Sequence, residues 1–333
     1  MSAALDSVEA RGGASEAPLT AIVTPVYNGD EFLRATMEAV QAQTYPNLVH
    51  VVLDNASTDG TAAIIADFAG KRVPVLAFRN EKTIPLPANW SAAMEHAPKE
   101  AKYLTVLCAD DLITPDFVAK MVAVAESDPG VELVGTMHRL DDKVVATTLP
   151  RGCAIFDGKK IAADFLNKKS NELPHMWGLY RRREEDFVAP FFDEAMMHFD
   201  TGACLRALAR GKFGFVREPV YIYRMHAASV TETVVKGSTH RRIDGMREIE
   251  QWAPKVMSPR AVAKAKARQA RFIHRAMREA KSAGRQDLFD EYAAFLSSRG
   301  FRQPMALDYL RAEIEWPLHR IMRRLRILRA QFS

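Results

Sequence analysis

Cysteine is scarce in this chain, and no long hydrophobic run occurs in it. The 333 residues include three cysteines, Cys108, Cys153 and Cys204. An odd number of widely spaced cysteines argues against a disulfide framework and against a cysteine zinc site, and it favours a reducing, cytoplasmic compartment. No apolar stretch approaches the roughly 20 residues that a membrane-spanning helix requires.

The first 18 residues are small, polar and acidic, and they lack the hydrophobic segment of a secretory signal. We therefore expect residues 1–18 to be a disordered tail. Hydrophobic residues make up 48% of the chain, which is enough for one large domain or two modest ones.

Positive charge is concentrated at one end of the chain. Residues 236–333 hold 22 Lys and Arg against 10 Asp and Glu, whereas the remainder holds 24 against 31. We expect 236–333 to be a basic helical C-terminal extension. Such a segment suits contact with anionic lipid, nucleic acid or an acidic partner, and it equally suits a solvated surface.

The first half alternates apolar, strand-like runs with amphipathic helical patterns. We expect strands at 19–25, 49–53, 73–78, 103–107 and 131–137, with helices at about 30–40, 61–68, 89–96 and 116–127 between them. This alternation predicts an α/β fold with a mostly parallel sheet covered by helices. In the second half we expect a loop-rich stretch at 141–175, a helix at 198–210 and a short strand at 220–224.

Two adjacent carboxylates, Asp110 and Asp111, directly follow the apolar run 103–107. The carboxyl ends of parallel strands form the ligand-binding edge of open α/β sheets. Hard divalent cations prefer one or two carboxylates together with phosphate oxygens, so these acids indicate a metal–diphosphate site. The segment alone is equally compatible with a solvated turn before Pro115.

Five motifs in this order resemble those of family 2 glycosyltransferases, which are inverting nucleotide-sugar enzymes of GT-A fold. They are Ile-Val-Thr-Pro-Val-Tyr-Asn at 22–28, the segment from Val52 to Thr61, Leu-Cys-Ala-Asp-Asp at 107–111, Phe199-Asp200, and Tyr-Arg-Met-His at 223–226. The resemblance covers about residues 19–232. It implies a GT-A fold with a helical C-terminal extension.

The resemblance also implies a set of donor-binding residues. Pro25 and Tyr27 would flank the nucleobase, and Asp54 would hydrogen-bond a uracil-type imide. Arg79 would approach the base or the phosphates, and Asp110 would face the ribose. Tyr27 alternatively fits a turn aromatic that packs on the sheet.

The resemblance further implies metal and catalytic residues. Asp111 would ligate the Mn²⁺ or Mg²⁺ that bridges the diphosphate, and His226 would close on the metal or the phosphate. Asp200 would be the catalytic base, although an acid in the first turn of a helix is also favoured by the helix dipole. Two positions depart from the family pattern. Cys108 stands where a further acid is common, and Phe199 precedes Asp200 where Glu is common, so Asp193 and Glu194 remain alternative bases.

We interpret residues 19–140 as a nucleotide-sugar-binding subdomain and 141–235 as an acceptor-binding and catalytic subdomain. Within the latter, Trp177 either lines the acceptor pocket or belongs to the core. The expected activity is inverting transfer of a sugar, from a UDP-sugar by preference, to a hydroxyl of a glycan or lipid-linked acceptor in polysaccharide or glycoconjugate synthesis. We expect no nucleic-acid partner.

Two other functions remain open. A sugar-phosphate nucleotidyltransferase would need a glycine-rich, basic phosphate loop after the first strand. Residues 24–30 instead contain one glycine and no basic residue. A non-catalytic membrane-binding or RNA-binding protein would use the basic tail, but the chain lacks the aromatic motifs of RNA-binding platforms.

The last segment, 316–333, has the pattern of a basic amphipathic helix. Its apolar residues share one stripe: Leu318, Ile321, Met322, Leu325, Leu328 and Phe332. Such a helix can lie in an anionic membrane interface. We expect a peripheral position at the inner face of the cell membrane, with packing of the stripe on protein as the alternative.

Overall fold

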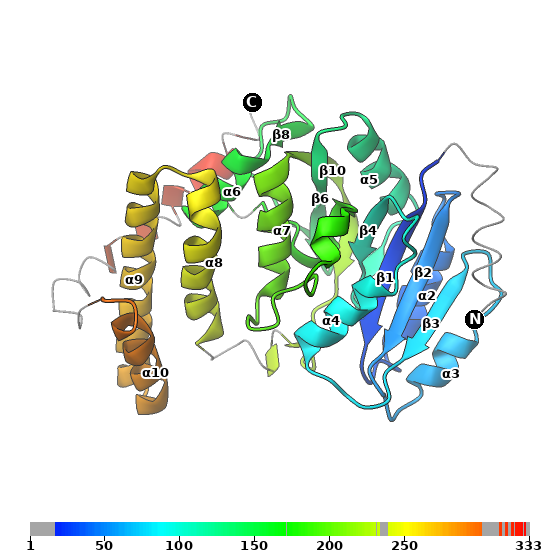
Figure 1. Ribbon diagram of the computed structural model, residues 1–333, viewed down its shortest axis with the longest axis horizontal. Coiled ribbons are helices and arrows are strands. Elements are labelled where there is room, and N and C mark those ends of the chain that lie inside the picture. Colours follow the sequence, from blue (N-terminus) through cyan, green and yellow to red (C-terminus); the bar gives the residue numbers. More distant parts are fainter. Residues whose placement is uncertain are drawn as a thin grey trace.

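A central β-sheet carries the fold, with helices on both of its faces (Figure 1). The computed structural model describes residues 17–170, 172–230, 232–233 and 239–301, and short stretches between 313 and 330. The expected tail, 1–18, lies outside the described residues apart from Ala17 and Pro18. The carbonyl of Pro18 accepts a hydrogen bond from the Tyr45 hydroxyl at 2.7 Å, which ties the chain there to the fold.

The sheet has ten strands, and eight of them form one continuous path. The order along the path is β3 (Val75–Arg79), β2 (Leu48–Asp54), β1 (Thr20–Val26), β4 (Tyr103–Val106), β9 (Leu179–Arg181), β6 (Val131–Leu140), β10 (Lys212–Tyr223) and β5 (Leu112–Ile113). The short β7 (Lys143–Val144) pairs with β6, and β8 (Ile155–Asp157) pairs with β10.

The expectation of a mostly parallel, helix-covered sheet is confirmed. Strands β3, β2, β1 and β4 run parallel to one another, and β6 and β10 form a second parallel pair. Strand β9 is antiparallel to both β4 and β6 and joins the two parallel sets. The two proposed subdomains therefore share one sheet.

Nine α-helices are assigned among the described residues up to Ser297. They are α2 (Leu33–Gln41), α3 (Thr61–Ala66), α4 (Leu86–Glu95), α5 (Phe117–Glu126), α6 (Gly158–Leu166), α7 (Phe199–Arg210), α8 (His240–Val256), α9 (Pro259–Ser282) and α10 (Gln286–Ser297). Two short 3₁₀ turns, η1 (His175–Trp177) and η2 (Glu184–Phe187), flank β9.

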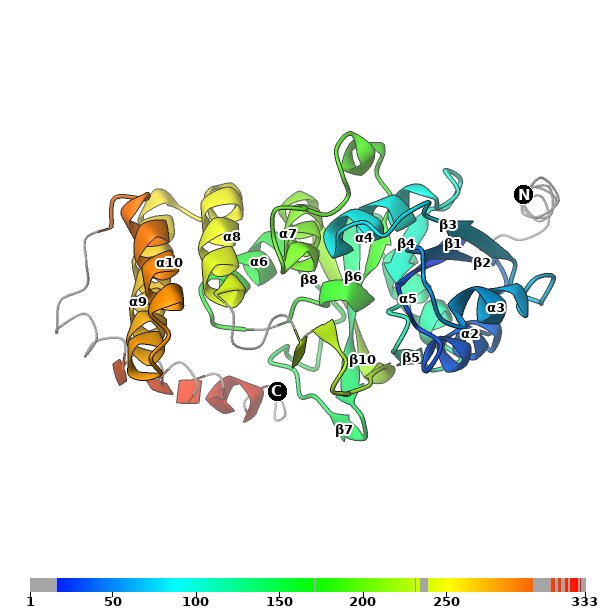
Figure 2. The same cartoon turned by 90° about the horizontal axis from the view of Figure 1, so that it is seen from below.

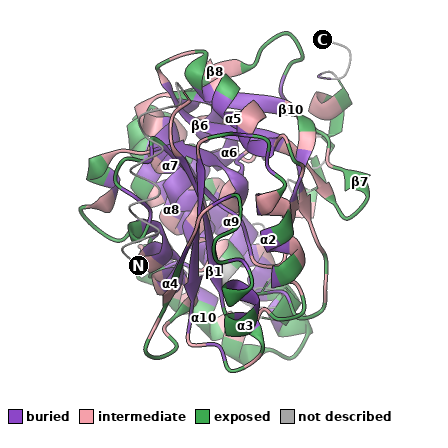
Figure 3. Ribbon diagram, turned by 90° about the vertical axis from the view of Figure 1, so that its right-hand side faces the viewer, coloured by how far each residue is buried: buried purple, intermediate pink, exposed green. Residues whose placement is uncertain are grey.

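Alternate residues of each buried strand contact opposite helical layers, as the two-residue period of a strand requires. On β1, Ala21 and Val23 pack in a core with α4, α6 and α7, whereas Ile22 packs in a second core with α2 and α5. Figure 3 shows the buried sheet inside helices whose outward faces are exposed. Because both faces are covered, the strands read as continuous apolar runs.

Two expectations for the second half were incomplete. The stretch 141–175, expected to be loop-rich, contains helix α6, which begins where the Asp157 carboxylate accepts a hydrogen bond from the Lys160 amide at 2.7 Å. Strand β10 spans residues 212–223 rather than 220–224. Its first half carries glycine, which weakens the sequence signal, but pairing with β6 and β8 stabilises an extended chain.

Helices α8, α9 and α10 lie at the end of the molecule away from β1–β3 (Figures 1 and 2). They enclose a separate small core that includes Met246, Ile273, Met277 and Tyr292. Tertiary packing of α8 on α6 and α7 connects this bundle to the rest of the fold. The helical character expected after residue 240 is thus observed through Ser297.

Candidate functional site

The carboxyl ends of β1, β2 and β4 meet at one edge of the sheet. Val26, the last residue of β1, lies opposite Asp54, the last residue of β2. On the other side of β1, the Leu107 amide donates to the Val23 carbonyl at 3.0 Å. Consequently the polar loops that follow these three strands are neighbours, as the sequence predicted.

Hydrogen bonds join the first two loops directly. The Asn28 amide donates to the Ser57 hydroxyl, and the Thr58 amide donates to the Asn28 side-chain oxygen, both at 2.9 Å. Asn28 has a φ of +47°, a left-handed conformation that asparagine adopts more readily than most residues. The turn leaves Tyr27 53% exposed, so its ring is open to a ligand, while Pro25 is buried in β1.

Asp54 and Arg79 form an ion pair at the same edge. Asp54 is 2% exposed, and its second oxygen accepts a hydrogen bond from the Ser57 amide at 2.9 Å. The Arg79 guanidinium also donates to the Ser57 carbonyl at 2.7 Å, and about half of its side chain is exposed. Two residues predicted separately for donor binding are therefore in contact.

Asp110 and Asp111 have very different surroundings. Asp111 is 1% exposed, and its two oxygens accept hydrogen bonds from the Tyr221 hydroxyl at 2.6 Å and from the Arg224 amide at 2.9 Å. Asp110 is more open, and one of its oxygens lies 2.9 Å from His226 Nε2. The His226 ring packs against Phe32, with the centroids 4.4 Å apart.

Burial and the neighbouring carboxylate raise the pKa of Asp111 to about 7, even though the hydrogen bonds from Tyr221 and Arg224 lower it. Burial also raises the pKa of the Cys108 thiol well above its usual value, and the charges of Asp111 and Asp110 add to this effect. Negative charge is thus concentrated on the turn after β4, where a bound cation would relieve it.

The donor set on this turn fits a hard divalent cation. Ligand atoms of Cys108, Asp110 and Asp111 lie within 4.8 Å of one another. Carboxylate oxygens suit Mn²⁺ or Mg²⁺, whereas a protonated, buried thiol does not. Asp111 is almost fully buried, whereas Asp110 and His226 are partly exposed, so the latter two are the more accessible donors. The roles expected of Asp111 as metal ligand and of Asp110 at the ribose stay predictions.

Asp200 lies in the first turn of α7. Its Oδ2 is 3.3 Å from His175 Nδ1, and its Oδ1 accepts a hydrogen bond from the Thr201 amide at 2.9 Å. The charge of Asp200 contributes to the raised pKa of the Cys108 thiol, so this carboxylate lies within electrostatic range of the turn that carries Asp110 and Asp111. The alternative bases, Asp193 and Glu194, are exposed, and no described contact joins them to this turn.

Trp177 is buried rather than open to solvent. It is 8% exposed and packs between His138 and Tyr221, with ring centroids 4.5 and 5.1 Å away. Its packing on Tyr221 supports the Asp111 site from behind and leaves little ring area for a sugar. This placement favours the core alternative for Trp177.

Sequence reasoning missed three residues that hold the site together. Tyr221 and Arg224 fix the turn after β4, and Thr36 on α2 donates to the Asp111 carbonyl at 2.9 Å. His175, which contacts Asp200, was also missed. Arg224 lies within the motif at 223–226 and Tyr221 lies two residues before it, so their position was the available signal, although neither was given a role. Thr36 and His175 carried no signal.

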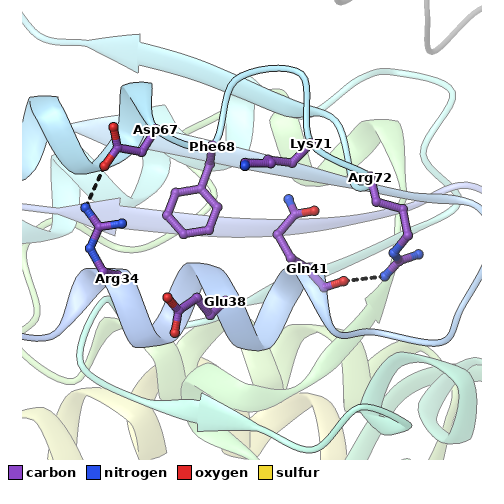
Figure 4. A pocket seen from close by; sticks show the side chains of 7 residues that line it. All are labelled: Arg34, Glu38, Gln41, Asp67, Phe68, Lys71 and Arg72. Atoms are coloured by element: carbon purple, nitrogen blue, oxygen red, sulfur yellow. Dashed lines mark hydrogen bonds and ion pairs between the residues drawn. The ribbon is translucent and has the colours of Figure 1, made fainter.

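A surface hollow lies away from this site, between α2 and the turn that follows α3 (Figure 4). Seven residues line it: Arg34, Glu38, Gln41, Asp67, Phe68, Lys71 and Arg72. None of them is a predicted site residue. Arg34 pairs with Asp67 at 2.6 Å, so part of the charge in the hollow is already neutralised.

Comparison with known proteins identifies the family. The family model described as glycosyl transferase family 2 matches residues 21–197. The chain belongs to this family. The matched range includes the loops after β1, β2 and β4 but ends before Asp200 and His226, whose roles therefore depend on the geometry above.

Curated relatives of this glycosyl transferase family 2 chain include two bacterial proteins. The putative glycosyltransferase EpsH of Bacillus subtilis (strain 168) is 24% identical over 237 residues, which are 66% of this chain and 65% of the relative. Glycosyltransferase GlyA of Streptococcus pneumoniae serotype 4 is 25% identical over 243 residues, which are 68% of this chain and 33% of the relative. The chain thus spans less than two thirds of either relative.

Solved structures share the GT-A fold. Residues 1–349 of S. aureus TarS in complex with UDP-GlcNAc superpose with a TM-score of 0.60 at 13% identity, covering 75% of this chain and 70% of that one. The mannosyltransferase PcManGT from Pyrobaculum calidifontis, in complex with GDP-Man and Mn²⁺, gives 0.53 at 14% identity, covering 99% and 94%. At these identities the likeness shows the fold.

Among the described residues, no helix combines the length and apolar character needed to cross a membrane.

Proposed function

We propose that this family 2 glycosyltransferase moves a sugar from a UDP-sugar to an acceptor hydroxyl in a metal-dependent reaction with inversion of configuration. The observation that carries the proposal is the partly exposed Asp110–His226 pair, which lies beside buried Asp111 at the edge of the sheet where Asp54 also ends its strand. A diphosphate held there would have a nucleobase site on one side and Asp200 on the other.

The donor half of the site is built by Asp54, Arg79 and Tyr27. The Ser57 amide and Arg79 fix the Asp54 carboxylate, whose remaining lone pairs suit an imide N–H of uracil. The half-exposed Arg79 adds a positive charge for the base or the phosphates. Tyr27 offers an open ring on which a base can stack.

Asp110 and His226 would hold the divalent cation, and Asp111 supports them from the interior. A bound cation supplies electrostatic stabilisation of the charge that develops on the diphosphate leaving group. Mn²⁺ and Mg²⁺ both fit carboxylate ligands, and the solved relative PcManGT was crystallised with Mn²⁺.

Asp200 would act as the base for the acceptor hydroxyl. Burial raises the pKa of Asp200, but its interactions with His175, His198 and the Thr201 amide outweigh this effect, so the pKa lies below its usual value and the carboxylate is ionised at neutral pH. One base is sufficient for a single displacement, which inverts the anomeric centre. Proton abstraction of this kind contributes roughly 10²–10⁴-fold to a rate.

The acceptor that suits this chain is a glycan or lipid-linked hydroxyl at an anionic membrane surface. Within 316–333, five described apolar residues are each about half exposed, namely Leu318, Ile321, Met322, Leu325 and Leu328, whereas Ile327 is partly buried and Ala330 is buried. Residues of the segment that lie outside the described residues include Trp316, Arg320, Arg323, Arg329 and Phe332. Exposed leucines interleaved with arginines match the chemistry of an anionic lipid interface.

Removal of residues 316–333 tests the membrane contact. Sedimentation with vesicles of phosphatidylcholine and phosphatidylglycerol should capture the full chain and lose the shortened one, and vesicles of phosphatidylcholine alone should capture neither. Equal capture of both chains by anionic vesicles would contradict this part of the proposal.

A panel of nucleotide sugars tests the activity. With Mn²⁺ or Mg²⁺ present, a UDP-sugar should bind and release UDP slowly to water, and a chelator should abolish both. The Asp110→Asn variant with metal present should show the same loss of binding and of UDP release as the wild type with a chelator. Binding of nucleotide sugars that is independent of metal, or absent for the whole panel, would overturn the proposal.

A further inference from the structure

His175 has an unusual backbone conformation for a residue with a large side chain. Its φ is +48°, in the left-handed region that costs most residues free energy. Two side chains donate to its carbonyl and hold the chain there: the Tyr180 hydroxyl at 3.3 Å and the Cys204 thiol at 3.6 Å. The rings of Phe165 and Trp177 pack edge-on to the imidazole. The fold therefore fixes the direction of this ring.

The fixed ring points at Asp200. His175 Nδ1 lies 3.3 Å from Asp200 Oδ2, and no other hydrogen bond of this ring occurs among the described residues. Because the Thr201 amide donates to Oδ1, each oxygen of the carboxylate is held by a different part of the chain. The side chains of His175 and Asp200 are 24% and 15% exposed, so the pair borders solvent without being solvated freely.

Six titratable groups lie within electrostatic range of Asp200. They are His175 on η1, Tyr180 on β9, His198 just before α7, Cys204 on α7, Glu248 on α8 and Cys108 after β4. Of these, His175 and His198 lower the pKa of Asp200, and only His175 does so through a hydrogen bond. The imidazole of His198 instead contacts Asp244, at 3.1 Å.

We propose that His175 is a positioning residue, which donates a hydrogen bond through Nδ1 and thereby aims the Asp200 carboxylate at the acceptor hydroxyl. This inference rests on the proposed function. In the transfer, the acceptor O–H bond breaks and its proton moves to Asp200. The electron pair of the acceptor oxygen forms the new bond to the anomeric carbon. The bond between that carbon and the diphosphate oxygen breaks, and its electron pair stays on the diphosphate. His175 gains and loses no proton.

Two substitutions separate the hydrogen bond from the backbone conformation. Asparagine and glycine both adopt the left-handed region, but only asparagine carries an N–H that can replace Nδ1. His175→Asn and His175→Gly both remove the ring, so a purely structural role predicts equal defects. His198→Asn is the matched control, since His198 affects Asp200 by charge without touching it.

The assay is release of UDP from UDP-GlcNAc with Mn²⁺, with water as the acceptor. We expect His175→Gly to lower kcat roughly 10- to 100-fold, the scale of one hydrogen bond to a charged group, with KM for the donor changed less than about twofold. The acid limb of its pH–rate profile should move to higher pH, because the interaction with His175 that lowers the pKa of Asp200 is lost while burial still raises it. His175→Asn should recover most of kcat, and His198→Asn should stay within about threefold of wild type.

Equal kcat losses in His175→Asn and His175→Gly, with an unmoved acid limb, would overturn the positioning role. A second measurement distinguishes this failure from failure of the proposed function. If wild type releases no nucleoside diphosphate from UDP-GlcNAc or GDP-mannose, the proposed function fails. The contact is then tested by NMR of ¹⁵N-histidine-labelled protein, in which Asp200→Asn should shift the Nδ1 resonance of His175; an unchanged resonance also overturns the inference.

Discussion

The Tyr221 hydroxyl donates a hydrogen bond to Asp111 Oδ2 at 2.6 Å, joining the end of β10 to the turn after β4 across 110 positions of sequence. Arg224 completes the junction, because its amide donates to the other Asp111 oxygen and its guanidinium to the Asp110 carbonyl. The acidic turn is therefore shaped by the second half of the chain. Asp111 acts as the anchor of this junction, and Asp110 is left facing the open side.

Tyr221→Phe should loosen this junction. The substitution leaves a buried carboxylate oxygen without its donor, which costs roughly 1–3 kcal/mol of unfolding free energy. We also expect weaker Mn²⁺-dependent UDP binding. Urea unfolding and calorimetric titration measure the two effects.

Tyr103→Phe is the matched control for that variant, since the Tyr103 hydroxyl bonds Glu126 rather than a site residue. It should lower stability without weakening UDP binding. Similar loss of UDP binding in both variants would mean that Tyr221 has no specific connection to the site.

Asp200→Asn should lower the rate of UDP release roughly 10²–10⁴-fold while UDP affinity stays within about twofold, because the amide keeps the shape but cannot accept a proton. Steady-state kinetics measure the rate of UDP release, and a binding titration measures the affinity for UDP. Asp193→Asn is the matched control, as Asp193 is exposed and bonds only its local turn, and it should retain the wild-type rate. A large loss in Asp193→Asn with normal turnover in Asp200→Asn would move the base to Asp193.

Asp110→Asn should abolish metal-dependent UDP binding with little change in stability, because Asp110 is partly exposed and asparagine keeps an oxygen for the contact with His226. Asp116→Asn provides a comparison. Asp116 is a partly exposed acid that also follows β4 in the chain, and its carboxylate pairs with Lys120. Isothermal titration of UDP with and without Mn²⁺ measures the effect. Undiminished Mn²⁺ dependence in Asp110→Asn would exclude Asp110 as a ligand.

His50 should make the folded protein less stable in mild acid. It is fully buried on β2, its Nε2 lies 2.9 Å from the Thr24 hydroxyl, and burial lowers its pKa to about 3. The unfolded chain, with a pKa near 6.5, then binds more protons, so stability is retained above pH 6.5 and declines as the pH falls toward 3. The slope is about 1.4 kcal/mol per pH unit in that window.

His50→Gln should flatten that dependence, because glutamine keeps a polar partner for Thr24 and does not titrate. Urea unfolding at pH 7.5 and pH 5 compares the two proteins. If the stability lost between these pH values is the same in both, another group is responsible for the acid sensitivity.

The sequence identified the first half of the fold well. The strands near 19–25, 49–53 and 103–107 were found because both faces of each are buried, which produces continuous apolar runs. Strand β9 was missed, since its three residues include Arg181, whose guanidinium is nevertheless buried and donates to the carbonyls of Val131 and Ala125. A short strand with a buried arginine has no local signature.

The sequence by itself determined the family, the parallel arrangement of the first strands and the acids that follow them, because strand-end position and residue type are local properties. Only the tertiary structure decided how those acids differ. It buried Asp111 against Tyr221, left Asp110 facing His226, enclosed Trp177 in the core and directed His175 at Asp200. Each of these outcomes depends on contacts between segments that are distant in the chain. Local sequence patterns do not show which distant segments meet.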